Sequence, residues 1–141
     1  AEAADVVFGM PCPITMIGLD VTEKIYMTPE NLDRFATFDN PMAQHLARIM
    51  PFYRGFYRKA LGVDGTFVHD STTISYLLRP ELFKTEQLPI RVETQGISRG
   101  KTWAARGRSE FETAWEGRPR INICVDVDAN AVIAVEFERL K

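Results

Sequence analysis

Blocks of apolar and polar residues along the chain predict strands and helices in turn. Ile14 to Leu19 is a near-continuous apolar run, which is typical of a strand covered on both faces in a parallel sheet. Ile121 to Val127 predicts a second buried strand, and Glu2 to Gly9 predicts a short helix. Buried strands that are covered by helices indicate the α/β class.

Two proline-containing signals predict where helices begin. In Thr28-Pro29, a threonine suited to capping precedes a proline at the first helical position, and Asn40-Pro41 repeats the signal. Pro51 is expected to kink the second helix or to restart it, because proline lacks the amide proton of the helical ladder. Gly62 is a plausible end of that helix.

The middle of the chain predicts a helix end followed by a hairpin. Arg79-Pro80 ends a helix, and Ile90 to Thr94 alternates as a strand does. Gly96 to Gly100 is turn-like, and Thr102 to Ala105 returns as a second strand. The polar segment from Arg106 to Arg120 predicts a loop or a short helix.

The C-terminal segment allows two interpretations. Ala131 to Val135 is β-branched enough to form a hairpin across Asp128 to Asn130. Alternatively, Asp128 caps a helix whose apolar residues recur at helical spacing. These residues are Val132, Ile133, Phe137 and Leu140.

Composition and charge exclude several classes of partner. The chain has 141 residues, 45% of them hydrophobic and 26% charged, which is ordinary for one globular domain. A net charge of −2 gives neither a basic stripe for a nucleic-acid polymer nor a polybasic patch for a membrane surface. The longest apolar run is well short of the roughly 20 residues that span a bilayer.

The two cysteines do not predict a metal or redox site. Cys12 and Cys124 are too few and too far apart for a zinc site or a Cys-x-x-Cys pair. We expect both to be small buried residues in a reducing compartment, which favours a cytoplasmic protein.

The dipeptide His69-Asp70 is the strongest candidate for chemistry, because it joins a proton donor to a hard metal ligand. It lies where an apolar segment gives way to a predicted helix, and such junctions hold polar groups on a rigid base. The structural alternative is that Asp70 or Ser71 caps the helix and that His69 is an ordinary half-buried histidine.

An aromatic stretch precedes this dipeptide. Tyr53 and Tyr57 stand four residues apart and share one helical face, next to Phe52 and Phe56. They are either ligand-contacting residues or part of a core stripe in which tyrosine keeps only its hydroxyl in water.

Several short motifs occur in a fixed order over nearly the whole chain. They are Pro13-Ile14-Thr15-Met16, Leu19-Asp20-Val21-Thr22, His69-Asp70, Tyr76-Leu77-Leu78, Pro80-Glu81-Leu82-Phe83, Val92-Glu93-Thr94, Arg99-Gly100 and a final Val125 to Asp128. In this order they resemble the C-terminal part of the inosine-uridine-preferring nucleoside hydrolase family. Ser71 and Glu23 replace a proline and a histidine that are common there, which indicates a divergent subgroup.

The resemblance implies a Rossmann-like nucleoside hydrolase fold, with mixed sheet strands flanked by helices and a helical C-terminus. Residues 1–141 would be the C-terminal part of a single domain, because the family's aspartate cluster and ribose-binding segment do not occur here. The chain begins inside an apparent helix and without a methionine, so we expect the N-terminal half of the same enzyme as its partner. Family members are usually homo-oligomers.

The resemblance also implies hydrolysis of the N-glycosidic bond of a ribonucleoside to ribose and free base. Asp70 would be one ligand of a calcium ion, with most other ligands supplied by the N-terminal half. His69 would protonate the leaving base, and Tyr53 and Tyr57 would bind the base or relay protons to it. The isolated chain is expected to be inactive. The alternative is a non-catalytic ligand-binding or interaction subunit derived from this fold.

Overall fold

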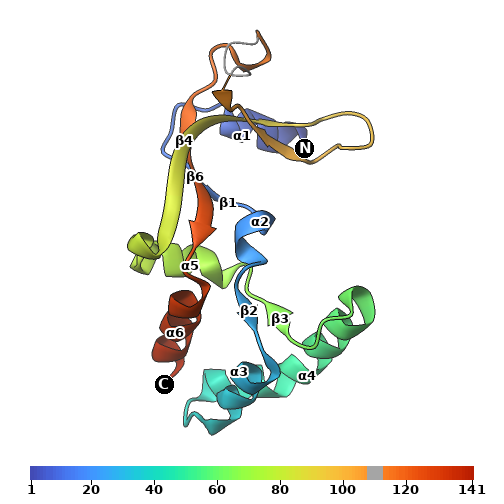
Figure 1. Ribbon diagram of the computed structural model, residues 1–141, viewed down its shortest axis with the longest axis vertical. Helices are drawn as coiled ribbons and strands as arrows, with labels where there is room; N and C mark the ends of the chain where they lie inside the picture. The colour runs from blue at the N-terminus through green and yellow to red at the C-terminus, as the bar shows by residue number, and fades with distance from the viewer. Residues whose placement is uncertain (108–112) are drawn as a thin grey trace. The chain divides into compact units, whose positions relative to one another are not determined.

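The structure is a computed structural model, which describes residues 1–107 and 113–141. It divides into two compact units (Figure 1). Unit 1 contains Ala1–Ile17 and Thr85–Val125, and unit 2 contains Gly18–Lys84 and Asp126–Lys141. Both contain helices and strands, which confirms the predicted α/β class.

Unit 1 is built on a four-stranded sheet in the order β1-β6-β4-β5. β1 (Thr15–Ile17) runs parallel to β6 (Arg120–Val127), as the apolar runs predict. β4 (Phe83–Val92) pairs antiparallel with β5 (Thr102–Ala104). The core of the sheet consists of Leu88, Ile90, Ile121 and Ile123, against which Phe8 at the end of α1 (Glu2–Phe8) packs.

Two strands of unit 1 have other limits than the sequence predicts. β1 ends at Ile17, and Leu19 begins the short helix α2 (Leu19–Thr22) with 64% of its side chain exposed. β4 begins at Phe83 rather than at Ile90. The apolar pattern does not predict this earlier part, because residues 84–87 are exposed and polar and show no apolar alternation. The predicted hairpin is confirmed, with Gly96 and Gly100 at φ values of 68° and 95° in its loop.

Unit 2 contains a two-stranded sheet and most of the helices (Figure 1). β2 (Tyr26–Met27) pairs antiparallel with β3 (Thr66–Phe67). Between them lie α3 (Pro29–Asp33), the 3₁₀ turn η1 (Arg34–Thr37) and α4 (Pro41–Leu61). α5 (Ser71–Leu78) and the 3₁₀ turn η2 (Pro80–Leu82) follow β3.

The predicted helix signals have their expected roles in unit 2. The Thr28 side chain accepts a hydrogen bond from Asn31 N, and Asn40 Oδ1 accepts one from Met42 N at 2.8 Å. Gly62 ends α4 in the left-handed conformation, with φ 69°. α4 continues through Pro51 as one helix of 21 residues, so a restart at Pro51 is wrong.

The C-terminal segment is the helix α6 (Ala129–Leu140), and the hairpin alternative is wrong. Asp128 Oδ1 accepts a hydrogen bond from Ala131 N at 3.0 Å, which is the predicted cap. Val132, Ile133 and Phe137 are buried on one side of the helix. Helical spacing buries these residues together, whereas a hairpin would place them on alternate faces.

Three further expectations from the sequence concern the loop, the cysteines and the membrane. In the segment 106–120, Thr113–Trp115 forms the 3₁₀ turn η4, and residues 108–112 lie outside the described residues. Cys124 is buried, but Cys12 is exposed, so the expectation of two buried cysteines is wrong for Cys12. Among the described residues no helix has the length and apolar character needed to cross a membrane.

Candidate active site

The imidazole of His69 has a hydrogen-bonding partner on each ring nitrogen. Thr22 Oγ1 lies 2.8 Å from Nδ1, and Tyr57 Oη lies 3.1 Å from Nε2. Thr22 and Tyr57 are 4% and 5% exposed, whereas His69 itself is partly exposed. The ring is therefore held in one orientation between two buried hydroxyl groups, on α2 and α4.

Backbone pairing places His69 at this position. Val68 N donates to Ile25 O at 3.0 Å, which continues the pairing of β2 with β3 beyond Phe67. His69 and Asp70 then form the connection between β3 and α5. The predicted junction between an apolar segment and a helix at His69-Asp70 is thus confirmed, and the apolar segment is the strand β3.

A salt-bridge cluster fastens the C-terminal part of α4 to the loop before β3. Arg54 and Arg58 both bind the Asp64 carboxylate, with Arg54 Nη2 at 2.8 Å and Arg58 Nη2 at 2.6 Å. Hydrogen bonds from these two guanidinium groups hold the pKa of Asp64 well below its usual range. Tyr26 Oη adds a bond to the Asp64 carbonyl at 2.7 Å. This anchoring fixes the part of α4 that carries Tyr57.

Tyr53 and Tyr57 lie side by side, as their spacing predicts, but in different environments. Their ring centroids are 5.2 Å apart, and Tyr53 is 43% exposed whereas Tyr57 is buried. Burial raises the pKa of the Tyr57 hydroxyl, and a hydrogen bond with Tyr53 raises it further. Tyr57 is therefore a buried, neutral hydroxyl at physiological pH, next to the partly exposed Tyr53.

Asp70 occupies the N-cap position of α5 without capping it through its side chain. Its backbone carbonyl accepts from Thr73 N and Thr73 Oγ1, while the side chain makes no capping hydrogen bond. Asp70 is exposed. The alternative in which the Asp70 side chain serves as a helix cap is therefore wrong, and the carboxylate is accessible to a ligand.

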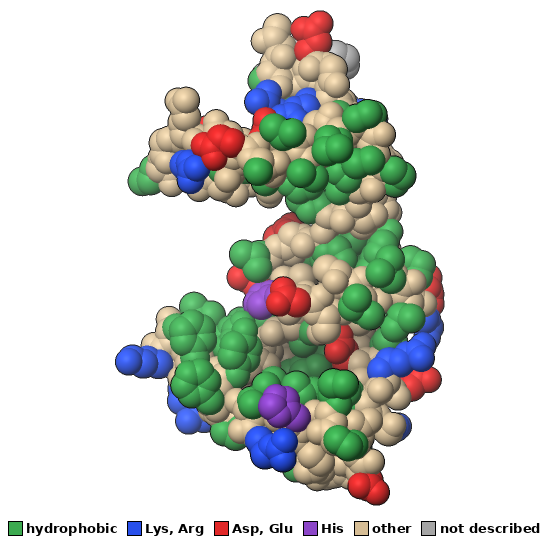
Figure 2. All heavy atoms as spheres, turned by 180° about the vertical axis from the view of Figure 1, so that it is seen from behind, with side chains coloured by type: hydrophobic (Ala, Val, Ile, Leu, Met, Phe, Trp, Pro, Cys, Tyr) green, Lys and Arg blue, Asp and Glu red, His purple; other side chains and the backbone are tan. Residues whose placement is uncertain are grey.

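A hollow of about 300 Å³ in unit 2 brings the candidate residues together, and Figure 2 shows hydrophobic side chains gathered around it. Its lining comes from the strands β2 and β3, the turn η1, the helices α4 and α6, and the segment from Val68 to Ser71. The lining residues are Met27, Phe35, Leu46, Met50, Tyr53, Thr66, Phe67, Val68, His69, Asp70, Ser71, Glu136 and Leu140. Three of the four predicted site residues therefore line one cavity, and Tyr57 joins them through His69.

Sequence reasoning missed two residues of this site. Thr22 contacts His69, and Glu136 lines the hollow while accepting a hydrogen bond from Ser75 Oγ at 2.9 Å. In the sequence, Thr22 stands out only as the last residue of a family motif, because an uncharged hydroxyl does not by itself indicate a functional site. Glu136 lay among several charged residues of the C-terminal segment.

The described residues do not contain the ligands of a complete metal site. They contain no group of three or more His, Cys, Asp or Glu that could hold an ion. Calcium takes six to eight oxygen ligands, of which the exposed Asp70 carboxylate is suited to be one. A calcium site that includes Asp70 would therefore need most of its ligands from outside the described residues.

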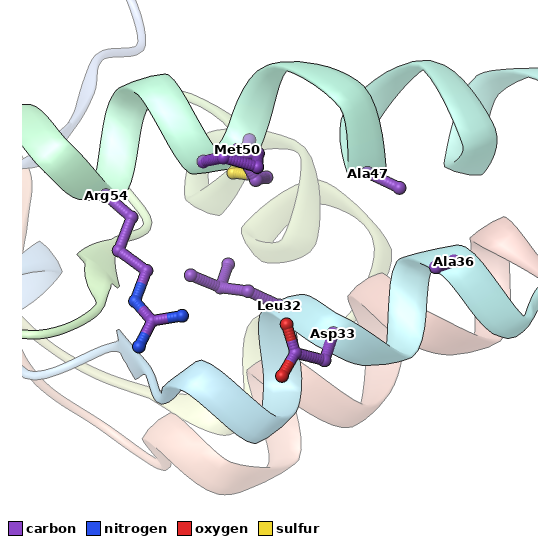
Figure 3. A pocket seen from close by; sticks show the side chains of 7 residues that line it. Leu32, Asp33, Ala36, Ala47, Met50 and Arg54 are labelled. Atoms are coloured by element: carbon purple, nitrogen blue, oxygen red, sulfur yellow. The ribbon is translucent and has the colours of Figure 1, made fainter.

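A second, smaller cavity lies between α3, η1 and α4, and it shares only Met50 with the hollow described above (Figure 3). Its volume is about 210 Å³, and its labelled lining includes Leu32, Met50 and Arg54. The Arg54 guanidinium is bound to Asp64. We assign no chemistry to this cavity.

Comparison with known proteins points to one family. The profile described as "Inosine-uridine preferring nucleoside hydrolase" matches residues 1–134. "Probable uridine nucleosidase 2" of Arabidopsis thaliana is 35% identical over 141 residues, which cover 99% of this chain and 44% of that protein. "Pyrimidine-specific ribonucleoside hydrolase RihA" of Klebsiella pneumoniae (strain 342) is 33% identical, with 99% of this chain and 44% of the relative covered.

A solved structure gives the same result for the fold. "Plant nucleoside hydrolase - PpNRh1 enzyme" is similar with a TM-score of 0.94 at 28% identity, covering 99% of this chain and 44% of that one. This match confirms the predicted nucleoside hydrolase fold. The chain spans less than half the length of each of these relatives.

Proposed function

The chain belongs to the inosine-uridine preferring nucleoside hydrolase family, and from this we propose that residues 1–141 form the C-terminal part of a single nucleoside hydrolase domain. The complete enzyme hydrolyses the N-glycosidic bond of ribonucleosides to ribose and free nucleobase. This chain supplies the leaving-group side of the site and one metal ligand. The observation that carries the proposal is the fixed His69 ring, bonded on both nitrogens and lining a cavity together with Asp70.

His69 is the general acid for the departing base. Breaking the N-glycosidic bond leaves its electron pair on a base nitrogen and gives an oxocarbenium-like ribosyl group. Protonating that nitrogen makes the base a better leaving group, and an imidazole is suited to this near neutral pH. Tyr57 bridges Nε2 of His69 toward the exposed Tyr53, so these two hydroxyl groups bind the base or carry the proton to it.

Asp70 contributes a carboxylate ligand to the metal. Nucleoside hydrolases are generally metal-dependent, and we assign Ca²⁺ because a carboxylate is a hard oxygen ligand. A calcium ion held there would supply a positive charge that orients the ribose hydroxyl groups and lowers the pKa of a water molecule bound to it. The remaining metal ligands come from the N-terminal half of the enzyme. The aspartate that acts as general base and takes the proton of the attacking water also comes from that half.

The proposed partners follow from the division of the active site between this chain and the N-terminal half of the enzyme. The N-terminal half of the enzyme completes the domain, and a ribonucleoside is the substrate. The assembly is a homo-oligomer in the cytoplasm, a location that the two free cysteines support. The alternative is a non-catalytic ligand-binding or interaction subunit derived from this fold, and the metal ligands of the N-terminal half decide between the two.

Mass measurement followed by an assay tests the proposal. Intact mass under denaturing conditions, with native mass beside it, reveals whether an N-terminal half is bound to this chain or continuous with it. The complete protein should release ribose from uridine or inosine and lose this activity with a calcium chelator, whereas residues 1–141 alone should be inactive. A complete protein that binds nucleosides but releases no ribose, with or without calcium, would establish the binding subunit instead.

A further inference from the structure

The Thr22 hydroxyl contacts His69 although Thr22 does not line the hollow. Thr22 is 4% exposed and is the last residue of the four-residue helix α2. Its Oγ1 lies 2.8 Å from Nδ1 of His69, and its proton can also point to Leu19 O at 3.5 Å. A buried hydroxyl with a second acceptor of its own can thus accept a hydrogen bond from the ring.

The state of the ring follows from what its two partners accept and donate. A neutral imidazole carries one N–H and one lone pair, and hydrogen-bond partners decide which nitrogen has the proton. When the Thr22 proton points to Leu19 O, Thr22 Oγ1 accepts from Nδ1–H. The Tyr57 hydroxyl then donates to the lone pair on Nε2. No polar group remains unpaired in this arrangement.

From this geometry we infer that Thr22 is a positioning residue that keeps the proton of neutral His69 on Nδ1, so that Nε2 is the nitrogen that exchanges protons through Tyr57. The inference rests on the proposed hydrolysis for its catalytic consequence, but the contact itself does not. In the doubly protonated ring, Nδ1–H donates to Thr22 and Nε2–H donates to Tyr57 Oη.

The proton transfer balances along this path. The C–N bond of the nucleoside breaks, and its electron pair goes to the base nitrogen. That nitrogen takes the hydroxyl proton of Tyr57, directly or through Tyr53, as Tyr57 takes the proton from Nε2 of His69. The ring is left neutral with its proton on Nδ1, where Thr22 accepts it. Without the Thr22 hydroxyl the neutral ring has no partner that favours this form.

Two substitutions at Thr22 and one matched control test the inference in the complete protein. Thr22→Val keeps the branched shape and removes the hydroxyl, whereas Thr22→Ser keeps the hydroxyl. Thr72→Val is the control, because Thr72 is 0% exposed and its hydroxyl donates to Val68 O at 2.7 Å. The control therefore removes a similarly buried hydroxyl that does not bind His69.

The first readout is the ¹⁵N chemical shifts of the His69 ring at a pH where the ring is neutral, which requires no turnover. We expect the Nδ1–H form in wild type, Thr22→Ser and Thr72→Val, and a mixture of forms in Thr22→Val. The second readout is the division of the effect between kcat and KM. Thr22→Val should lower kcat by about 10- to 100-fold, as loss of a partner that orients a functional histidine does, with KM nearly unchanged.

Several results would overturn the inference. An Nε2–H ring in wild type does so without any variant, even if Thr22→Val fails to fold. A Thr22→Val protein that keeps both the wild-type kcat and the Nδ1–H ring also overturns it. So does a Thr72→Val protein whose kcat falls as much as that of Thr22→Val. A wild type that has the Nδ1–H ring but releases no ribose contradicts the proposed function and leaves the Thr22 contact established.

Discussion

Tyr57 and His69 are twelve positions apart in the sequence and meet at 3.1 Å between Oη and Nε2. The contact joins the C-terminal part of the longest described helix to the connection between β3 and α5. Because Tyr57 is buried and Tyr53 is half exposed, the contact gives His69 a polar path toward the aromatic surface of α4.

Removing the Tyr57 hydroxyl should slow the reaction without disturbing the packing. Tyr57→Phe keeps a ring against Phe67, whose centroid lies 5.6 Å away, and removes the hydroxyl that bonds to His69 and to Tyr53. We expect kcat of the complete enzyme to fall by about tenfold or more. Steady-state hydrolysis of uridine and inosine measures this. Tyr53→Phe, which does not touch the His69 ring nitrogens, should have a smaller effect, and the reverse order would contradict the relay through Tyr57.

Asp70 should determine metal dependence rather than folding. Asp70→Asn replaces a charged ligand by a neutral amide, so the calcium concentration for half-maximal activity should rise by about tenfold or more. Asp39→Asn is the matched control, because Asp39 is also exposed and lies on the segment before α4. Activity is measured across a calcium titration after chelation. Identical calcium curves for Asp70→Asn and Asp39→Asn would remove Asp70 from the proposed metal site.

The cap of α6 should contribute measurably to stability. Asp128→Ala removes the side-chain acceptor for Ala131 N, which lies at 3.0 Å, and should lower the free energy of unfolding by about 1 kcal/mol. Asn130→Ala, an exposed position in the same first turn, is expected to be neutral or slightly stabilising. Urea unfolding of the complete protein measures both variants. Equal midpoints for Asp128→Ala and wild type would mean that the cap is not formed in solution.

The two cysteines should differ strongly in reactivity. Burial raises the pKa of the Cys124 thiol to about 11, so it stays protonated at pH 8 and is also shielded. Cys12 is exposed. Iodoacetamide added to the native protein should therefore label Cys12 first, which peptide mass mapping shows, and both cysteines should react after denaturation. Labelling of Cys124 at the rate of Cys12 in the native protein would contradict the packing of β6.

The sequence predicts those parts of the fold that depend on local signals. The caps at Thr28 and Asn40 and the turn glycine at Gly62 act within a few residues, so their effect is readable from the chain itself. The apolar pattern predicts β4 only from Ile90 onward, because the first half of the strand is polar and exposed. Backbone pairing forms this half of the strand, and such pairing has no signature in the side-chain pattern. The C-terminal segment stayed ambiguous because β-branched residues suit both helix and strand until burial decides.

The candidate site was predictable to the extent that its chemistry is charged or aromatic. His69 and Asp70 are conspicuous as a pair, and the spacing of Tyr53 and Tyr57 places them on one helical face. Thr22 was not predictable, because it lies 47 positions from His69 and only the tertiary fold brings its hydroxyl to Nδ1. A neutral side chain that acts through a long-range hydrogen bond leaves no local signal.

The central claim is that His69 protonates the leaving base, and the chain provides its own control for the test. His45 is the other of the two histidines and is exposed on α4. In the complete enzyme with calcium, His69→Ala should lower kcat on uridine or inosine by about 100-fold or more, since general acid catalysis contributes at least that much. His45→Ala should keep wild-type turnover. Near wild-type turnover of the His69→Ala enzyme, with calcium bound and the fold intact, would contradict the assignment.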